Sequence, residues 1–181
     1  MVICMDFEKL ENNIMAVIKE NQIKLGYRKE TVRLYYPLSS LNRYLCASYT
    51  CEQMRKVLKD FEIQFCNRYG QLQITNEGER FCFCFSDEVS EYVHNHTESS
   101  GFLYDLIAFV SKHGIVIEDM IALFRQYSDR VHVEKMSHGE FDYLLYFEDG
   151  NPDDFRYCIT EEGAHLSYHR YTKEDYEDFV F

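Results

Sequence analysis

The basic side chains of residues 27–68 are the ones whose type and spacing point most directly to a chemistry, the binding of phosphate. This segment holds eight Lys and Arg against four Asp and Glu, a net charge of +4. Residues 69–181 carry a net charge of −15, and the whole chain −12. Because Lys and Arg neutralise the phosphates of a nucleic-acid backbone, nucleic acid is a candidate partner if these side chains share one surface.

Two short helices followed by a β-hairpin must position these side chains. Leu41, Tyr44 and Leu45 predict a helix over about 39–47. Thr50-Cys51-Glu52-Gln53 has the form of a capping box and predicts a second helix that ends near Phe61. Alternating apolar residues in 71–75 and 80–85 then predict two strands joined by a tight turn.

This helix–turn–helix–hairpin order over residues 39–85 resembles a winged-helix module. In that family the second helix enters the major groove of DNA and the hairpin forms the wing. The resemblance implies that Arg55, Lys56 and Lys59 face nucleic acid and that Arg43 extends the same positive face.

Acidic residues depart from the pattern of a DNA-binding wing. Glu52 lies near the start of the second helix, and the hairpin tip carries Glu77 and Glu79 with only Arg80 beside them. Winged helices also serve as protein-interaction or dimerisation modules. Both interpretations stay open at this level, and a protein partner is preferred over nucleic acid.

Two further groups have the residue types of metal ligands. His94 and His96 are predicted to lie in a polar loop, and residues 148–154 gather four carboxylates and an amide around Gly150. The histidines lack a third ligand in the sequence, and the acidic loop lacks the spacing of an EF-hand. Ordinary polar loops explain both, so no metal and no cofactor is expected.

Enzyme signatures are missing from the sequence. There is no nucleophile elbow, no phosphate-binding loop, no dinucleotide fingerprint and no zinc-protease motif. No catalytic residue is therefore assigned, and a non-enzymatic function is favoured. The seven cysteines form no C-x-x-C motif, and neither a leader nor a run of about 20 apolar residues is present. A protein of the cytoplasm with reduced thiols and without a membrane segment is expected.

Periodicity along the chain predicts an α+β fold. A mainly helical N-terminal part contains one β-hairpin, and four strand-like runs after residue 130 predict an antiparallel meander. Residues 1–181 are expected to form a single compact unit, within which lobes 1–95 and 96–181 can be distinguished.

The strings Pro37-Leu38-Ser39-Ser40-Leu41-Asn42 and Gly78-Glu79-Arg80-Phe81-Cys82 are similar to those of a small uncharacterised bacterial family. This resemblance implies no activity. The sequence therefore favours a cytosolic protein-interaction or regulatory module with an acidic surface. The alternative is a winged-helix DNA-binding regulator with a C-terminal sensing or dimerisation lobe.

Overall fold

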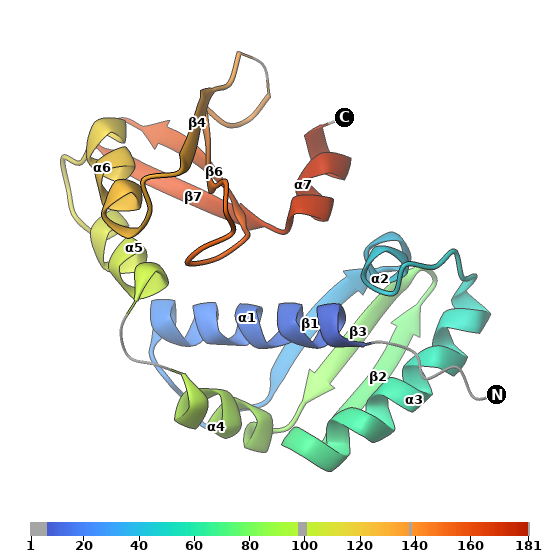
Figure 1. Cartoon of the computed structure of the whole chain (residues 1–181). Coiled ribbons are helices and arrows are strands. Elements are labelled where there is room, and N and C mark those ends of the chain that lie inside the picture. Colours follow the sequence, from blue (N-terminus) through green and yellow to red (C-terminus); the bar gives the residue numbers. More distant parts are fainter. Residues whose placement is uncertain (1–6, 98–100, 138, 181) are drawn as a thin grey trace. The chain divides into compact units, whose positions relative to one another are not determined.

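A computed structural model describes residues 7–97, 101–137 and 139–180, with the backbone alone for 178–180. Over these residues the chain has seven helices and two antiparallel sheets (Figure 1). The predicted α+β fold, with its four-stranded C-terminal meander, is confirmed. The chain divides into two compact units, Met1–Glu98 and Ser99–Phe181, which are described separately below. The expectation of one compact unit over the whole chain stays a prediction.

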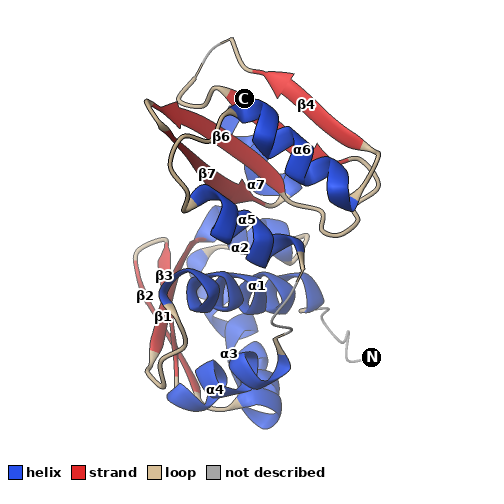
Figure 2. Cartoon of the chain, turned by 90° about the vertical axis from the view of Figure 1, so that its left-hand side faces the viewer, coloured by secondary structure: helices blue, strands red, loops and turns tan. Residues whose placement is uncertain are grey.

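The N-terminal unit combines four helices with a three-stranded sheet. Its elements are α1 (Glu8–Leu25), β1 (Val32–Pro37), α2 (Leu38–Tyr44), α3 (Cys51–Tyr69), β2 (Leu72–Glu77), β3 (Arg80–Phe85) and α4 (Asp87–His96). The sheet order is β1-β3-β2, and both neighbouring pairs are antiparallel. The helices lie on one side of this sheet (Figure 2).

Aromatic side chains from the sheet fill the core of this unit. Phe81, Phe83 and Phe85 alternate along β3 and are buried, because successive strand residues point to opposite faces. Phe61 of α3 packs against Phe83 and also against Phe7, just before α1. The core thus joins α1, α3 and the sheet.

Helices α3 and α4 are longer than the sequence predicted. The expected end of α3 near Phe61 is wrong because Phe65, four residues later, continues the buried stripe and packs on Phe85. The loop predicted over residues 94–100 is wrong at its start, and residues 98–100 of it lie outside the described residues. The α4 helix continues to His96, whose ring stacks on Tyr92 one turn earlier.

The C-terminal unit packs helices on both faces of a four-stranded sheet. Its elements are α5 (Phe102–Val110), α6 (Ile117–Tyr127), β4 (Val131–Lys135), β5 (Tyr143–Phe147), β6 (Arg156–Glu162), β7 (His165–Tyr171) and α7 (Lys173–Val180). The strands follow in chain order. Residues of α5 and α6 share a core with Leu145, Phe147 and Tyr157. Tyr176 of α7 packs with Leu144 and Cys158, which point to the other face.

Candidate functional site

The exposed face of α3 is the surface on which the sequence placed a binding site. The helix buries Met54, Leu58, Phe61 and Phe65, which recur at helical spacing and leave the opposite face to solvent. Its start is fixed by the predicted capping box. Thr50 Oγ1 accepts a hydrogen bond from the Gln53 backbone N–H at 3.4 Å, and Gln53 Oε1 accepts one from the Thr50 N–H at 2.9 Å.

The charges on this face balance. Over residues 52–62, three basic residues lie with three acidic ones: Arg55, Lys56, Lys59, Glu52, Asp60 and Glu62. Lys56 Nζ lies 3.1 Å from a carboxylate oxygen of Glu52, and Lys59 Nζ lies 3.1 Å from one of Glu62. Within the described part of the chain, Arg55 makes no ion pair. The helix therefore offers paired charges, not a continuous positive stripe.

The fourth predicted residue, Arg43, lies on α2 and is half-buried. Its Nη2 donates a hydrogen bond to Ser40 Oγ at 3.0 Å. The structure thus brings Arg55, Lys56 and Lys59 together on one exposed helix and places Arg43 on a different element. Binding of nucleic acid by these four residues stays a prediction.

The hairpin that would serve as a wing lies beside the start of α3. Cys51 Sγ donates a hydrogen bond to the Gly78 carbonyl at 3.5 Å, and Gly78 has a φ of 57° that suits a tight turn. Glu77 and Glu79 flank this turn and are exposed. The guanidinium of Arg80 lies 4.3 Å from the centre of the Tyr35 ring on β1.

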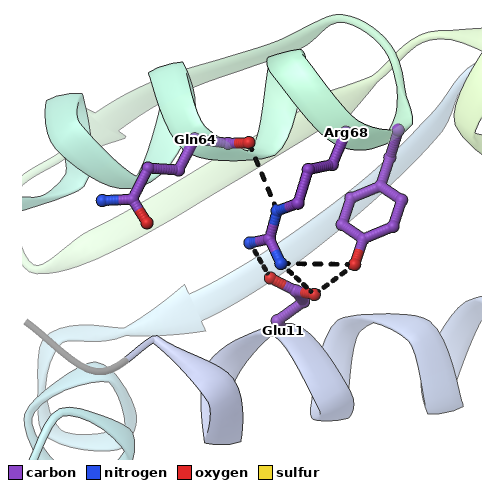
Figure 3. Close-up of polar contacts among 4 residues, drawn as sticks. Glu11, Gln64 and Arg68 are labelled. Carbon is purple, nitrogen blue, oxygen red and sulfur yellow. Dashed lines mark hydrogen bonds and ion pairs between the residues drawn. The ribbon is translucent and has the colours of Figure 1, made fainter.

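A polar cluster joins α1 to the end of α3 (Figure 3). Arg68 donates to both carboxylate oxygens of Glu11, one of them at 3.0 Å, and its Nε donates to the Gln64 carbonyl at 3.4 Å. The Tyr69 hydroxyl also donates to Glu11. Burial and this hydrogen bond raise the pKa of Tyr69 to about 12. The Arg68 side chain thus links α3 to α1.

The histidines considered as metal ligands are engaged with aromatic rings. His94 stacks on Tyr27, with ring centres 4.0 Å apart, and His96 Nδ1 lies 2.8 Å from the Tyr92 carbonyl. Two residues apart on a helix, they point in different directions. Among the described residues, no three His, Cys, Asp or Glu side chains are grouped so as to hold a metal ion.

In the C-terminal unit, the carboxylates of the acidic loop bind the protein itself. Asp149 accepts the Asn151 backbone N–H at 3.2 Å, and Asp153 accepts the Phe155 N–H at 3.2 Å. Asp153 also accepts a hydrogen bond from the buried Tyr157 hydroxyl at 2.5 Å. Burial raises the pKa of Asp153, although these two hydrogen bonds oppose the shift. Loop structure accounts for both carboxylates.

A row of planar side chains crosses the C-terminal sheet and was not foreseen from the sequence. His132 stacks on Tyr146 at 4.5 Å, and the Arg156 guanidinium lies 3.8 Å from the centre of the Tyr146 ring. Arg156 pairs in register with Tyr171 on β7. The rings of His132 and Tyr146 each face a side chain of the next strand, which indicates cross-strand stabilisation. Strand alternation gives the face of each residue, but only the register brings them together.

Comparison with known families identifies one family, whose function is unknown. A family model described as "Domain of unknown function, E. rectale Gene description (DUF3877)" matches residues 7–180 and confirms the expected resemblance. Neither a curated protein nor a solved structure matches the chain. No helix in the described ranges is long and apolar enough to cross a membrane. Because the match spans nearly all of the sequence, the chain belongs to this family of domains of unknown function, DUF3877.

Proposed function

We propose that this protein is a cytoplasmic, non-enzymatic interaction or regulatory module whose N-terminal unit resembles a winged helix but binds protein. The α2–α3 pair followed by the β2–β3 hairpin supports the resemblance. Fold alone does not decide the ligand, so the choice between protein and DNA depends on the chemistry of the surface.

The balanced charge of the α3 face is the observation that carries this proposal. Lys56 and Lys59 each have a carboxylate within 3.1 Å, and Ile63 is 62% exposed farther along the helix. A helix that binds DNA needs cations that release counterions from phosphate. A mixed surface with an exposed apolar side chain is instead typical of a contact with protein.

The partner expected for the C-terminal unit is a basic protein. Residues 99–181 hold 7 Lys and Arg against 17 Asp and Glu, a net charge of −10. Such a field accelerates the approach of a positively charged partner and repels nucleic acid. Association should therefore weaken as salt is added.

A DNA titration separates the two candidate functions. With the full chain and labelled duplex DNA at low salt, we expect no saturable rise in fluorescence anisotropy. The second candidate, a DNA-binding regulator, is favoured by one observation, the exposed Arg55 that lacks an ion pair within the described residues. Saturable binding that falls steeply with salt would establish it, provided that Lys56→Glu weakens binding and Lys112→Glu, in the other unit, does not.

A capture experiment tests the protein partner directly. The immobilised full chain should retain a basic protein from bacterial lysate at low salt and release it at high salt. The double variant Glu140→Lys and Glu161→Lys, changed at two exposed carboxylates, should retain less. If the unchanged chain and the double variant retain equal amounts of the basic protein, the proposed role of the acidic surface is contradicted.

A further inference from the structure

A groove in the N-terminal unit lies between the C-terminal half of α1 and the start of β1. Its volume is about 440 Å³, within the range of ligand sites. Ile18, Leu25 and Val32 supply apolar surface, and Leu25 is 77% exposed. Arg28, Glu30 and Arg33 supply the ionisable groups of its lining. An exposed leucine beside a hollow of this size would be covered by an apolar side chain of a ligand.

One wall of this groove is a strand edge with open hydrogen-bonding groups. The Leu38 N–H donates to the Glu79 carbonyl at 2.8 Å, which continues the register of β1 with β3. In an antiparallel pair, bonding to the neighbour alternates along the strand. Val32, Leu34 and Tyr36 therefore bond to β3, whereas the backbone groups of Arg33 and Tyr35 point away from it.

At the opposite edge of the same sheet, outward backbone groups of β2 have a hydrogen-bond partner within the protein. There the outward-pointing Leu72 N–H donates to Cys66 Sγ at 3.2 Å, and Cys66 in turn donates to the Leu72 carbonyl. Among the described residues, nothing plays this role for the backbone of Arg33 or Tyr35. Both residues are exposed, and β1 is thus an edge able to accept another strand.

The cations of the groove also lack carboxylate partners. Elsewhere in the basic segment Lys29, Lys56, Lys59 and Arg68 are ion-paired with carboxylates, whereas Arg55 on α3 has no such pair among the described residues. Within the described residues, the guanidinium groups of Arg28 and Arg33 have no carboxylate partner, and Arg33 has a hydrogen bond to the Cys84 side chain. Two unpaired cations against one carboxylate make this groove locally positive on a chain of net charge −12.

We infer that this groove binds an extended peptide segment of a partner protein, which pairs with the free edge of β1 as a fourth strand. Main-chain hydrogen bonds to Arg33 and Tyr35 supply affinity, as in other cases of strand addition. One apolar side chain of the peptide enters the hollow beside Ile18 and Leu25. An acidic side chain nearby pairs with Arg28 or Arg33. The site differs in place and in charge from the acidic surface proposed above.

The competing interpretation is an edge protected against pairing. Proteins protect exposed edges with charged residues and proline, and β1 carries Arg33 and ends at Pro37. Hydrogen exchange of the protein without peptide tests whether the outward backbone groups of β1 are open to solvent. The Arg33 and Tyr35 amides should exchange rapidly, and those of Leu34 and Tyr36 slowly. Slow exchange at all four would overturn the inference.

A phage-displayed library of random linear peptides, selected on the full chain, supplies the probe. Selected sequences should carry an apolar and an acidic residue, and a synthetic copy of one should slow exchange at Arg33 and Tyr35. Arg33→Glu should weaken its binding about tenfold, the effect of about 1.4 kcal/mol. Failure to select any peptide, or binding without this protection, would overturn the inference and leave the proposed acidic contact standing.

A matched pair of variants at one position distinguishes strand addition from side-chain recognition. Tyr35→Pro removes an outward N–H and leaves the bonds of β1 to β3 intact, since proline is tolerated on strand edges. Tyr35→Thr removes the same ring and keeps the N–H. Binding should be lost only with proline, while circular dichroism shows both variants folded. Equal binding by the two variants, or equal loss, would count against a fourth strand.

Discussion

At the residue scale, the Glu11–Arg68 pair shows how burial changes the value of an ion pair. The Glu11 side chain is only 12% exposed and also accepts the Tyr69 hydroxyl. We expect Glu11→Gln to lower the free energy of unfolding by about 1–2 kcal/mol, measured by urea denaturation. The control is Glu52→Gln, whose exposed pair with Lys56 should contribute less than about 0.5 kcal/mol. Equal losses would contradict this difference.

The buried Asp153–Tyr157 contact should make stability depend on pH. Tyr157→Phe removes a donor to a half-buried carboxylate and should cost about 1–3 kcal/mol of unfolding free energy at neutral pH. The pKa of Asp153 is higher in the folded than in the unfolded protein, so protonation of Asp153 stabilises the fold. This stabilisation is complete below the pKa of the unfolded state and is lost as the pH rises through the pKa of the folded state. The Tyr157 hydrogen bond favours the ionised carboxylate, so it contributes less once Asp153 is protonated. The stability lost in Tyr157→Phe should therefore become smaller toward about pH 4. Tyr127→Phe, changed in an exposed pair with Asp105, is the control and should show little pH dependence.

At the element scale, the capping box of α3 is a local signal with a measurable effect. Thr50→Ala should lower the free energy of unfolding by about 1 kcal/mol, because the Gln53 N–H loses its acceptor. Thr50→Ser keeps the hydroxyl and should restore most of this loss. Ser48→Ala, in the preceding loop, should change stability by less than about 0.5 kcal/mol. Denaturation by urea, with the slope unchanged, provides the measurement.

The sequence was sufficient for the elements whose signals are local. The box at Thr50, the buried stripe from Met54 to Phe61 and the turn at Gly78 act within a few residues, and each is found where periodicity predicted it. The four later strands are likewise found where the sequence predicted strand-like runs. The same logic failed at His94, because the helix continues to His96, whose ring stacks on Tyr92 one turn earlier.

Contacts between distant segments could not be predicted. The place of β1 beside β3 requires pairing of residues about fifty positions apart, such as Arg33 with Cys84, and pattern does not specify a partner. The surroundings of the predicted binding residues could not be predicted for the same reason. Sequence put Arg55, Lys56 and Lys59 on one helix, but their neutralising neighbours follow from side-chain geometry. The open edge at Arg33 and Tyr35 depends on which strand neighbours which.

At the scale of the whole molecule, the two units have separate cores, and this separation predicts separate stabilities. Met54 belongs to the core of the N-terminal unit and Met120 to that of the C-terminal unit, and both are 0% exposed. Alanine at either position should cost about 2–5 kcal/mol through lost burial and the cavity left behind. The two variants therefore make the same chemical change in different cores.

Hydrogen exchange followed by mass spectrometry shows in which unit each substitution lowers the stability. Met54→Ala should speed exchange in peptides from residues 7–97 and leave those from 101–180 near the wild-type rate, and Met120→Ala should do the opposite. Such units open separately when the contacts between them contribute little to either core. If either substitution speeds exchange equally in both units, the chain unfolds as one cooperative domain, as expected from its length alone.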